Sequence, residues 1–126
     1  MAQKKLLIIE DDKSLTTLYQ QILLHNDLTH QIVHDGHQAL DSLEEYKPNV
    51  VLLDMHIPLV SGTEILHRIQ GHPHCQDADI ILASADSALC HKWEHRVHKV
   101  FIKPFSISEL ITAIKELSTA DGQPHP

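Results

Sequence analysis

The sequence predicts one α/β domain in which five parallel strands alternate with five helices. Two observations lead to this fold class. Short apolar runs recur along the chain, and a segment with helical periodicity follows each of them. The runs are continuous rather than alternating, which is typical of strands that a parallel sheet buries on both faces. Because strands that alternate with helices form right-handed crossovers, we expect helices on both faces of the sheet.

Apolar spacing and turn residues predict the first two strand–helix units. Residues 6–9 are a short apolar run that ends at three consecutive acidic residues. The next segment has apolar residues at the positions that share one face of a helix, namely Leu15, Leu18, Tyr19, Ile22 and Leu23. Residues 29–34 predict the second strand, and Asp35-Gly36 predicts a turn after it. A second helix around Leu40 ends at Lys47-Pro48, because the residue before a proline disfavours helical backbone angles.

The other three units follow the same pattern. Their strands are predicted at three apolar runs, residues 50–53, 80–83 and 100–102. A loop bracketed by Pro58 and Gly62 precedes the third helix. Residues 87–97 predict a fourth helix with a weaker apolar face. Ser106 is the predicted N-cap of the last helix, and Glu109 completes a capping box.

Length and composition narrow the class of protein. The chain has 126 residues, the size of one domain, and its net charge of −7 argues against a basic, nucleic-acid-binding surface. No apolar run approaches the roughly 20 residues of a membrane helix, and the N-terminus lacks the long apolar stretch of a signal peptide. Two cysteines are too few for a disulfide scaffold. We therefore expect a soluble, cytoplasmic domain over residues 1–118, with residues 119–126 as a flexible tail or the start of a linker.

Polar residues follow four of the five predicted strands. Glu10 and Asp11 follow the first strand, Asp54 the third, Ser84 the fourth and Lys103 the fifth. Because the carboxyl ends of parallel strands meet at one edge of the sheet, we expect these side chains to lie together. Crowded carboxylates need a cation, and oxygen ligands select a hard ion such as Mg²⁺. A lysine and a hydroxyl are the groups that bind the remaining oxygens of a phosphoryl group.

Four motifs in this order make the chain resemble a response-regulator receiver domain, the phosphoacceptor module of two-component signalling. They are residues 7–12, residues 52–58 with Gly62 and Glu64 beyond, residues 83–85 and residues 103–105. The resemblance covers nearly the whole chain. It implies a doubly wound, flavodoxin-like (βα)5 fold of three layers, similar to that of chemotaxis regulators, with the strand order 2-1-3-4-5.

The resemblance also implies a role for each site residue. Asp54 would accept a phosphoryl group from a phosphohistidine of a histidine kinase or histidine phosphotransfer protein. The ligands of Mg²⁺, or of Mn²⁺ as a substitute, would be Glu10, Asp11, Asp54 and the backbone carbonyl of His56. Ser84 would be the switch hydroxyl, and Lys103 would pair with a phosphoryl oxygen. The peptide bond before Pro104 would be cis.

The implied output surface has one departure from the family pattern. Receiver domains signal to a partner protein or output domain through the fourth helix, the fifth strand and the fifth helix. They often carry Tyr or Phe three residues before the lysine, where this chain has Val100. Phe101 comes one place later and, by strand alternation, faces the opposite side of the sheet. Trp93 on the fourth helix is either a partner contact or a packing residue. The chain is either a free-standing receiver or a part of a larger regulator or hybrid kinase.

The polar residues allow two other interpretations. A haloacid-dehalogenase-like phosphatase also uses a nucleophilic aspartate with Mg²⁺, but it needs an aspartate two places later, where this chain has His56. We therefore expect a signalling phosphoacceptor that catalyses only its own phosphorylation and dephosphorylation. The histidines could bind a metal, because His91 and His95 share a helix face near Cys90 and His98. No matched partner pair accompanies them, so the sequence favours surface histidines.

Overall fold

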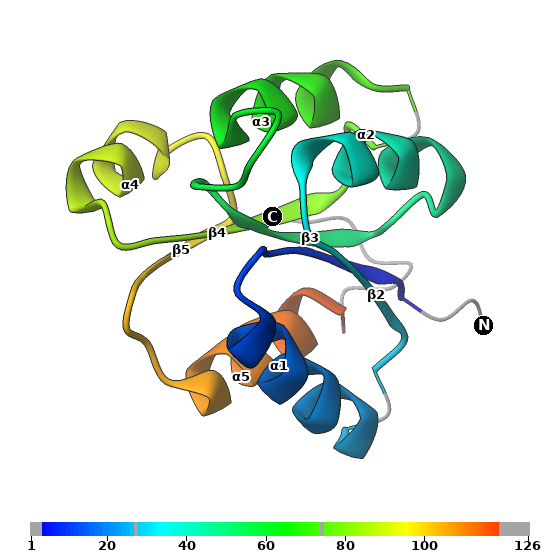
Figure 1. The fold of residues 1–126 in the computed structure, drawn as a ribbon, viewed down its shortest axis with the longest axis vertical. Helices are drawn as coiled ribbons and strands as arrows, with labels where there is room; N and C mark the ends of the chain where they lie inside the picture. Colours follow the sequence, from blue (N-terminus) through cyan, green and yellow to red (C-terminus); the bar gives the residue numbers. More distant parts are fainter. Residues whose placement is uncertain (1–3, 27, 74, 119–126) are drawn as a thin grey trace.

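Five parallel strands form one sheet in the order β2-β1-β3-β4-β5, which confirms the predicted topology (Figure 1). The strands are β1 (Leu6–Ile9), β2 (His30–Val33), β3 (Val50–Asp54), β4 (Asp79–Ser84) and β5 (Lys99–Ile102). The helices are α1 (Lys13–His25), α2 (Gly36–Glu45), α3 (Gly62–Gly71), α4 (Ser87–Trp93) and α5 (Ile107–Ser118). The computed structural model describes residues 4–26, 28–73 and 75–118, so the tail expected at 119–126 lies outside the described residues.

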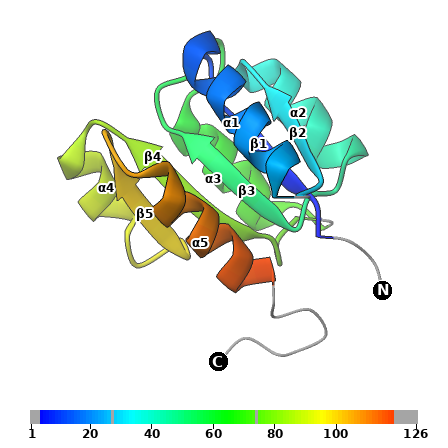
Figure 2. The ribbon, with the colours of Figure 1, turned by 90° about the horizontal axis from the view of Figure 1, so that it is seen from below.

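Helices cover both faces of the sheet, as predicted. Helices α2, α3 and α4 lie on one face, and α1 and α5 lie on the other (Figures 1 and 2). Each face has its own apolar core, and the three central strands are buried along their whole length. Burial on both faces explains why these strands are continuous apolar runs in the sequence. No helix of the described ranges is long and apolar enough to cross a membrane.

The strand ends bring the polar residues to one edge of the sheet. Ile9 is paired with Leu53 across β1 and β3, and Ser84 is paired with Ile102 across β4 and β5. Glu10 and Asp54, which follow the first pair, therefore emerge at the same level. Lys103 emerges two residues further along, because Asp54 is paired with Ala83 and Ala83 with Phe101. The backbone N–H of Lys103 also donates to the carbonyl of Ser84 at 2.9 Å, which joins two of the predicted site residues through the main chain.

Three local predictions were wrong. Asp35-Gly36 is a helix start rather than a turn, because the Asp35 carboxylate caps α2 by accepting from the N–H of Gln38 at 2.8 Å. Helix α4 ends at Trp93 rather than near residue 97, because the chain must turn there to pair β5 with β4. Leu18, expected on the buried face of α1, is 41% exposed. The predicted cap of α5 is present, since the N–H of Glu109 donates to the Ser106 hydroxyl at 3.4 Å.

Candidate functional site

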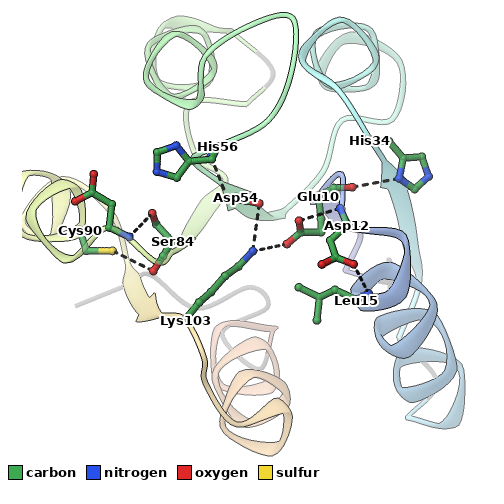
Figure 3. A network of polar contacts seen from close by, with 10 residues as sticks. Glu10, Asp12, Leu15, His34, Asp54, His56, Ser84, Cys90 and Lys103 are labelled. Atoms are coloured by element: carbon green, nitrogen blue, oxygen red, sulfur yellow. Dashed lines mark hydrogen bonds and ion pairs between the residues drawn. The ribbon is translucent and has the colours of Figure 1, made fainter.

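Lys103 joins two of the acidic residues at the carboxyl edge of the sheet into one polar network (Figure 3). The Lys103 ammonium donates to Glu10 Oε1 at 2.9 Å and to Asp54 Oδ2 at 3.2 Å. Glu10 comes directly after β1, Asp54 ends β3, and Lys103 directly follows β5. The sheet topology therefore joins three residues that are far apart in the sequence, as predicted.

Glu10 is held in place by the start of α1. Its Oε2 accepts the backbone N–H of Asp12 at 3.2 Å, and Asp12 in turn caps α1 by accepting from the N–H of Leu15 at 3.1 Å. The pKa of Glu10 is raised to about 7, chiefly by burial and also by the neighbouring Asp54, while the hydrogen bond from Lys103 acts against both. The carboxyl group therefore stays protonated at a higher pH than an exposed glutamate does.

Lys103 is the cation that balances these acids. Burial acts to lower its pKa, but the hydrogen bond to Glu10 and the charge of Asp54 outweigh burial, so the pKa of Lys103 is raised. The ammonium keeps its charge across the physiological pH range, and it bridges the two carboxylates.

The acidic residues have the geometry and chemistry of a hard-cation site. One carboxylate oxygen from each of Glu10, Asp11 and Asp54 lies within 4.8 Å of the others. Glu10 and Asp54 are buried, whereas Asp11 is exposed. An all-oxygen set with one open side suits Mg²⁺, which retains several waters when it binds protein. A divalent cation would also relieve the repulsion between these carboxylates.

The side chains of Asp54 and Ser84 each accept a hydrogen bond from a backbone N–H two residues later in the sequence. The N–H of His56 donates to Asp54 Oδ1 at 3.0 Å, so both oxygens of Asp54 are engaged, while the His56 side chain is exposed. Ser84 is fully buried, and its hydroxyl accepts the N–H of Asp86 at 3.0 Å. Ser84 thus lies at the predicted edge, with its hydroxyl bonded to the start of α4 and not to the Lys103 network (Figure 3). The Lys103–Pro104 peptide bond is cis.

Sequence reasoning missed two contacts that organise this edge. His34 Nδ1 lies 3.1 Å from the carbonyl of Glu10, and Asp86 caps α4 while its N–H holds the Ser84 hydroxyl. A signal existed for Asp86, because an aspartate three residues before an apolar helical position is a typical N-cap. No signal existed for His34, because its contact depends on how β2 ends beside β1.

A model of the response regulator receiver domain family matches residues 6–115 of this chain. The chain belongs to this family. The receiver domain is 27% identical to the response regulator ArlR of Staphylococcus aureus over 116 residues, which are 90% of this chain and 52% of that protein. It spans about half the length of the curated relatives that it matches.

Solved structures agree with the family assignment. The receiver domain of the sensor histidine kinase PA1611 from Pseudomonas aeruginosa, which holds a magnesium ion in its active-site cleft, superposes with a TM-score of 0.83 at 21% identity, covering 94% of this chain and 99% of that one. The response regulator TrrA from Thermotoga maritima, in complex with Mg²⁺-BeF, gives a TM-score of 0.80 at 25% identity, covering 91% and 99%. The receiver domain described here thus has the fold of its family.

Proposed function

We propose that this receiver domain accepts a phosphoryl group on Asp54 from a phosphohistidine, in a reaction that requires Mg²⁺. The observation that carries the proposal is the placement of Asp54. It is a buried aspartate beside Lys103 and lies within one carboxylate cluster with Glu10 and Asp11. The magnesium-bound relatives described above, together with the family match, support the same role.

Each residue of the site has a separate role in the proposed phosphoryl transfer. A carboxylate oxygen of Asp54 forms a bond to phosphorus as the bond from phosphorus to the donor imidazole breaks, and the electron pair stays on the imidazole nitrogen. Lys103, already within 3.2 Å of Asp54, pairs with a phosphoryl oxygen. Glu10, Asp11, Asp54 and the carbonyl of His56 would hold Mg²⁺, which would supply positive charge against the charge that develops on the phosphoryl oxygens.

Ser84 is the proposed switch. Its hydroxyl is bonded to the N–H of Asp86 at 3.0 Å, and it can rotate to donate to a phosphoryl oxygen instead. That exchange releases a contact at the start of α4, so phosphorylation would alter α4. Hydrolysis of the acyl phosphate restores the original contacts. We infer a cytoplasmic signalling protein that catalyses only these two steps on itself, and the family match does not favour the dehalogenase-like alternative.

We propose separate surfaces for the phosphoryl donor and for the output partner. A pocket of about 350 Å³ opens beside Lys103 and is lined by apolar side chains, among them Leu15, Phe105 and Ile107. A histidine kinase or histidine phosphotransfer protein would dock there, because the donor imidazole must reach Asp54. The output partner or output domain would contact α4, β5 and α5. No role in nucleic-acid or membrane binding is proposed for residues 1–118.

The phosphoacceptor role is tested by mass spectrometry of the intact protein. With a small acyl phosphate and Mg²⁺, the wild-type protein should gain one phosphoryl group, and EDTA should abolish the gain. Asp54→Asn should show no gain. Asp41→Asn is the matched control, because Asp41 is an exposed aspartate on α2 that lies outside the carboxylate cluster. Wild-type labelling of Asp54→Asn, or labelling that persists in EDTA, would overturn the proposal.

A further inference from the structure

Three exposed side chains of metal-ligand type meet at the end of α4. His91 Nδ1 lies 3.5 Å from Glu94 Oε2, and His95 Nε2 lies 3.6 Å from Glu94 Oε1. The two imidazoles therefore approach different oxygens of one carboxylate. The side chains of His91, His95 and Glu94 are 71%, 92% and 43% exposed, so none of them contributes to a core.

The backbone keeps this trio together. Residue 94 follows the last residue of α4 and retains helical angles, with φ −57° and ψ −28°. Residues four apart on such a turn are neighbours on one helix face, and residues three apart are nearly so. His91 lies three residues before Glu94 and four before His95, and the adjacent Glu94 and His95 side chains approach each other to 3.6 Å. Rotation of the exposed side chains can bring a nitrogen of each imidazole to one cation.

We propose that His91, Glu94 and His95 form a second cation site, on the surface, that binds borderline transition-metal ions of the Zn²⁺, Ni²⁺ and Cu²⁺ class. Two imidazole nitrogens with one carboxylate oxygen suit these ions, whereas the all-oxygen cluster at Asp54 suits Mg²⁺. The two sites therefore differ in ion class and lie at different places in the fold. Glu94 acts either as the third ligand or as the acceptor that orients a ligating imidazole, as carboxylates do beside metal-bound histidines.

The neighbouring cations leave this site open. The guanidinium of Arg96 lies over the Trp93 ring at 4.6 Å from its centroid, so its charge is held on the ring. Lys92 is exposed. A cation bound by this trio would connect the last turn of α4 to the turn that follows it. Helix α4 has only seven residues, and its N-cap Asp86 is hydrogen-bonded to Ser84 at the other end.

The chain carries its own probe for this site. Its one tryptophan, Trp93, lies between His91 and Glu94 in the sequence and is 2% exposed. Ni²⁺ is a fluorescence quencher, so a titration with Ni²⁺ in excess Mg²⁺ should quench Trp93 and reach saturation. His91→Gln and His95→Gln should each weaken the apparent affinity by about tenfold or more, because each removes one imidazole ligand. Glu94→Gln should weaken it as well.

Controls separate this site from the others. His37→Gln removes an exposed histidine on α2 and should leave the titration unchanged. Asp54→Asn should also leave it unchanged, so the result does not depend on the phosphoacceptor role. The emission of each variant without Ni²⁺ shows whether Trp93 remains buried. Absent or non-saturating quenching in the wild type, wild-type affinity in both histidine variants or in Glu94→Gln, or loss of quenching in Asp54→Asn would each overturn the proposal.

Discussion

Leu59 has an unusual backbone for a residue with a branched side chain. Its φ is 77°, in the left-handed region, and the N–H of Val60 donates to the carbonyl of Pro58 at 3.0 Å across it. This is a γ-turn of the rare, strained hand. The Leu59 side chain is 69% exposed, so its burial contributes little stability to offset this strain. The strain lies in the loop between β3 and α3, a few residues after Asp54.

Leu59→Gly should therefore stabilise the protein. Glycine adopts this φ freely, and the relief of about 1–2 kcal/mol exceeds the roughly 0.5–1 kcal/mol that glycine loses through its flexible unfolded state. The matched control is Leu24→Gly, a change at a similarly exposed leucine inside α1, which should cost about 1 kcal/mol. Urea unfolding of both variants measures the two effects. A loss of stability in Leu59→Gly would contradict the assignment of strain.

Single residues differ in how far the sequence predicts them. The meeting of Glu10, Asp54 and Lys103 follows from strand order alone, so it was predictable. The strain at Leu59 was not, because Pro58 and Gly62 predict a loop but position 59 itself holds no glycine or asparagine to indicate a positive φ. The burial of Trp93 was also open from the sequence, and the structure decides it, since the ring packs in the core of the α2, α3 and α4 face.

Helix α3 begins where the backbone just after β3 leaves no room for a side chain. A Cβ on Gly62 would lie 2.6 Å from Met55 Cα and 2.7 Å from its carbonyl oxygen, which are backbone atoms. Met55 directly follows Asp54 at the end of β3. The closeness of these two backbones thus positions the loop that follows the candidate phosphorylation site.

Gly62→Ala should cost stability, whereas the same change at Gly71 should not. The added methyl group at Gly62 forces Met55 to move, and overpacking of this kind typically costs 1–3 kcal/mol. A Cβ on Gly71, at the other end of α3, meets nothing within 4 Å, so Gly71→Ala should be neutral or gain up to about 1 kcal/mol. Thermal unfolding compares them. Equal stability of the two variants would refute the close approach.

Element boundaries were less predictable than element types. The faces of β5 were predicted correctly, since Val100 packs with the α2, α3 and α4 core and Phe101 with the α1 and α5 core. The length of α4 was not, because its end is decided by pairing between β5 and β4, which are separated in the sequence. The exposure of Leu18 shows the same limit, because helical periodicity gives a face but not its width.

Across the whole molecule, the acidic cluster ties folding to pH and to metal. The pKa of Glu10 is raised by its surroundings, so the folded protein holds this proton more tightly than the unfolded chain does. Stability from this group is fully present below about pH 4.5 and is lost as the pH rises through about 7. In EDTA, this group should therefore make the free energy of unfolding fall between these pH values.

Two further measurements test whether the acidic cluster causes this fall in the free energy of unfolding with pH. Asp54→Asn removes a neighbour that raises the pKa of Glu10, so the fall with pH should flatten, while Asp41→Asn should keep it. Mg²⁺ should stabilise the wild type more at pH 8 than at pH 5, because its ligands must be ionised. If its Kd is about 1 mM, then 10 mM Mg²⁺ contributes roughly 1.4 kcal/mol. A gain from Mg²⁺ that is unchanged by Asp54→Asn would contradict the cluster as its binding site.

The pairing of β5 with β4 has a consequence for misfolding. Val100 lies opposite Leu82, and Ser84 lies opposite Ile102. If β5 slipped by one residue, every side chain on it would change faces, which would press Phe101 into the space that Val100 fills. The same slip would draw Lys103 away from Glu10 and Asp54 and leave two buried acids without their cation. Core packing and ion pairing thus favour the same alignment independently. A chain with β5 misaligned would lose stability both from poor packing and from unpaired buried acids.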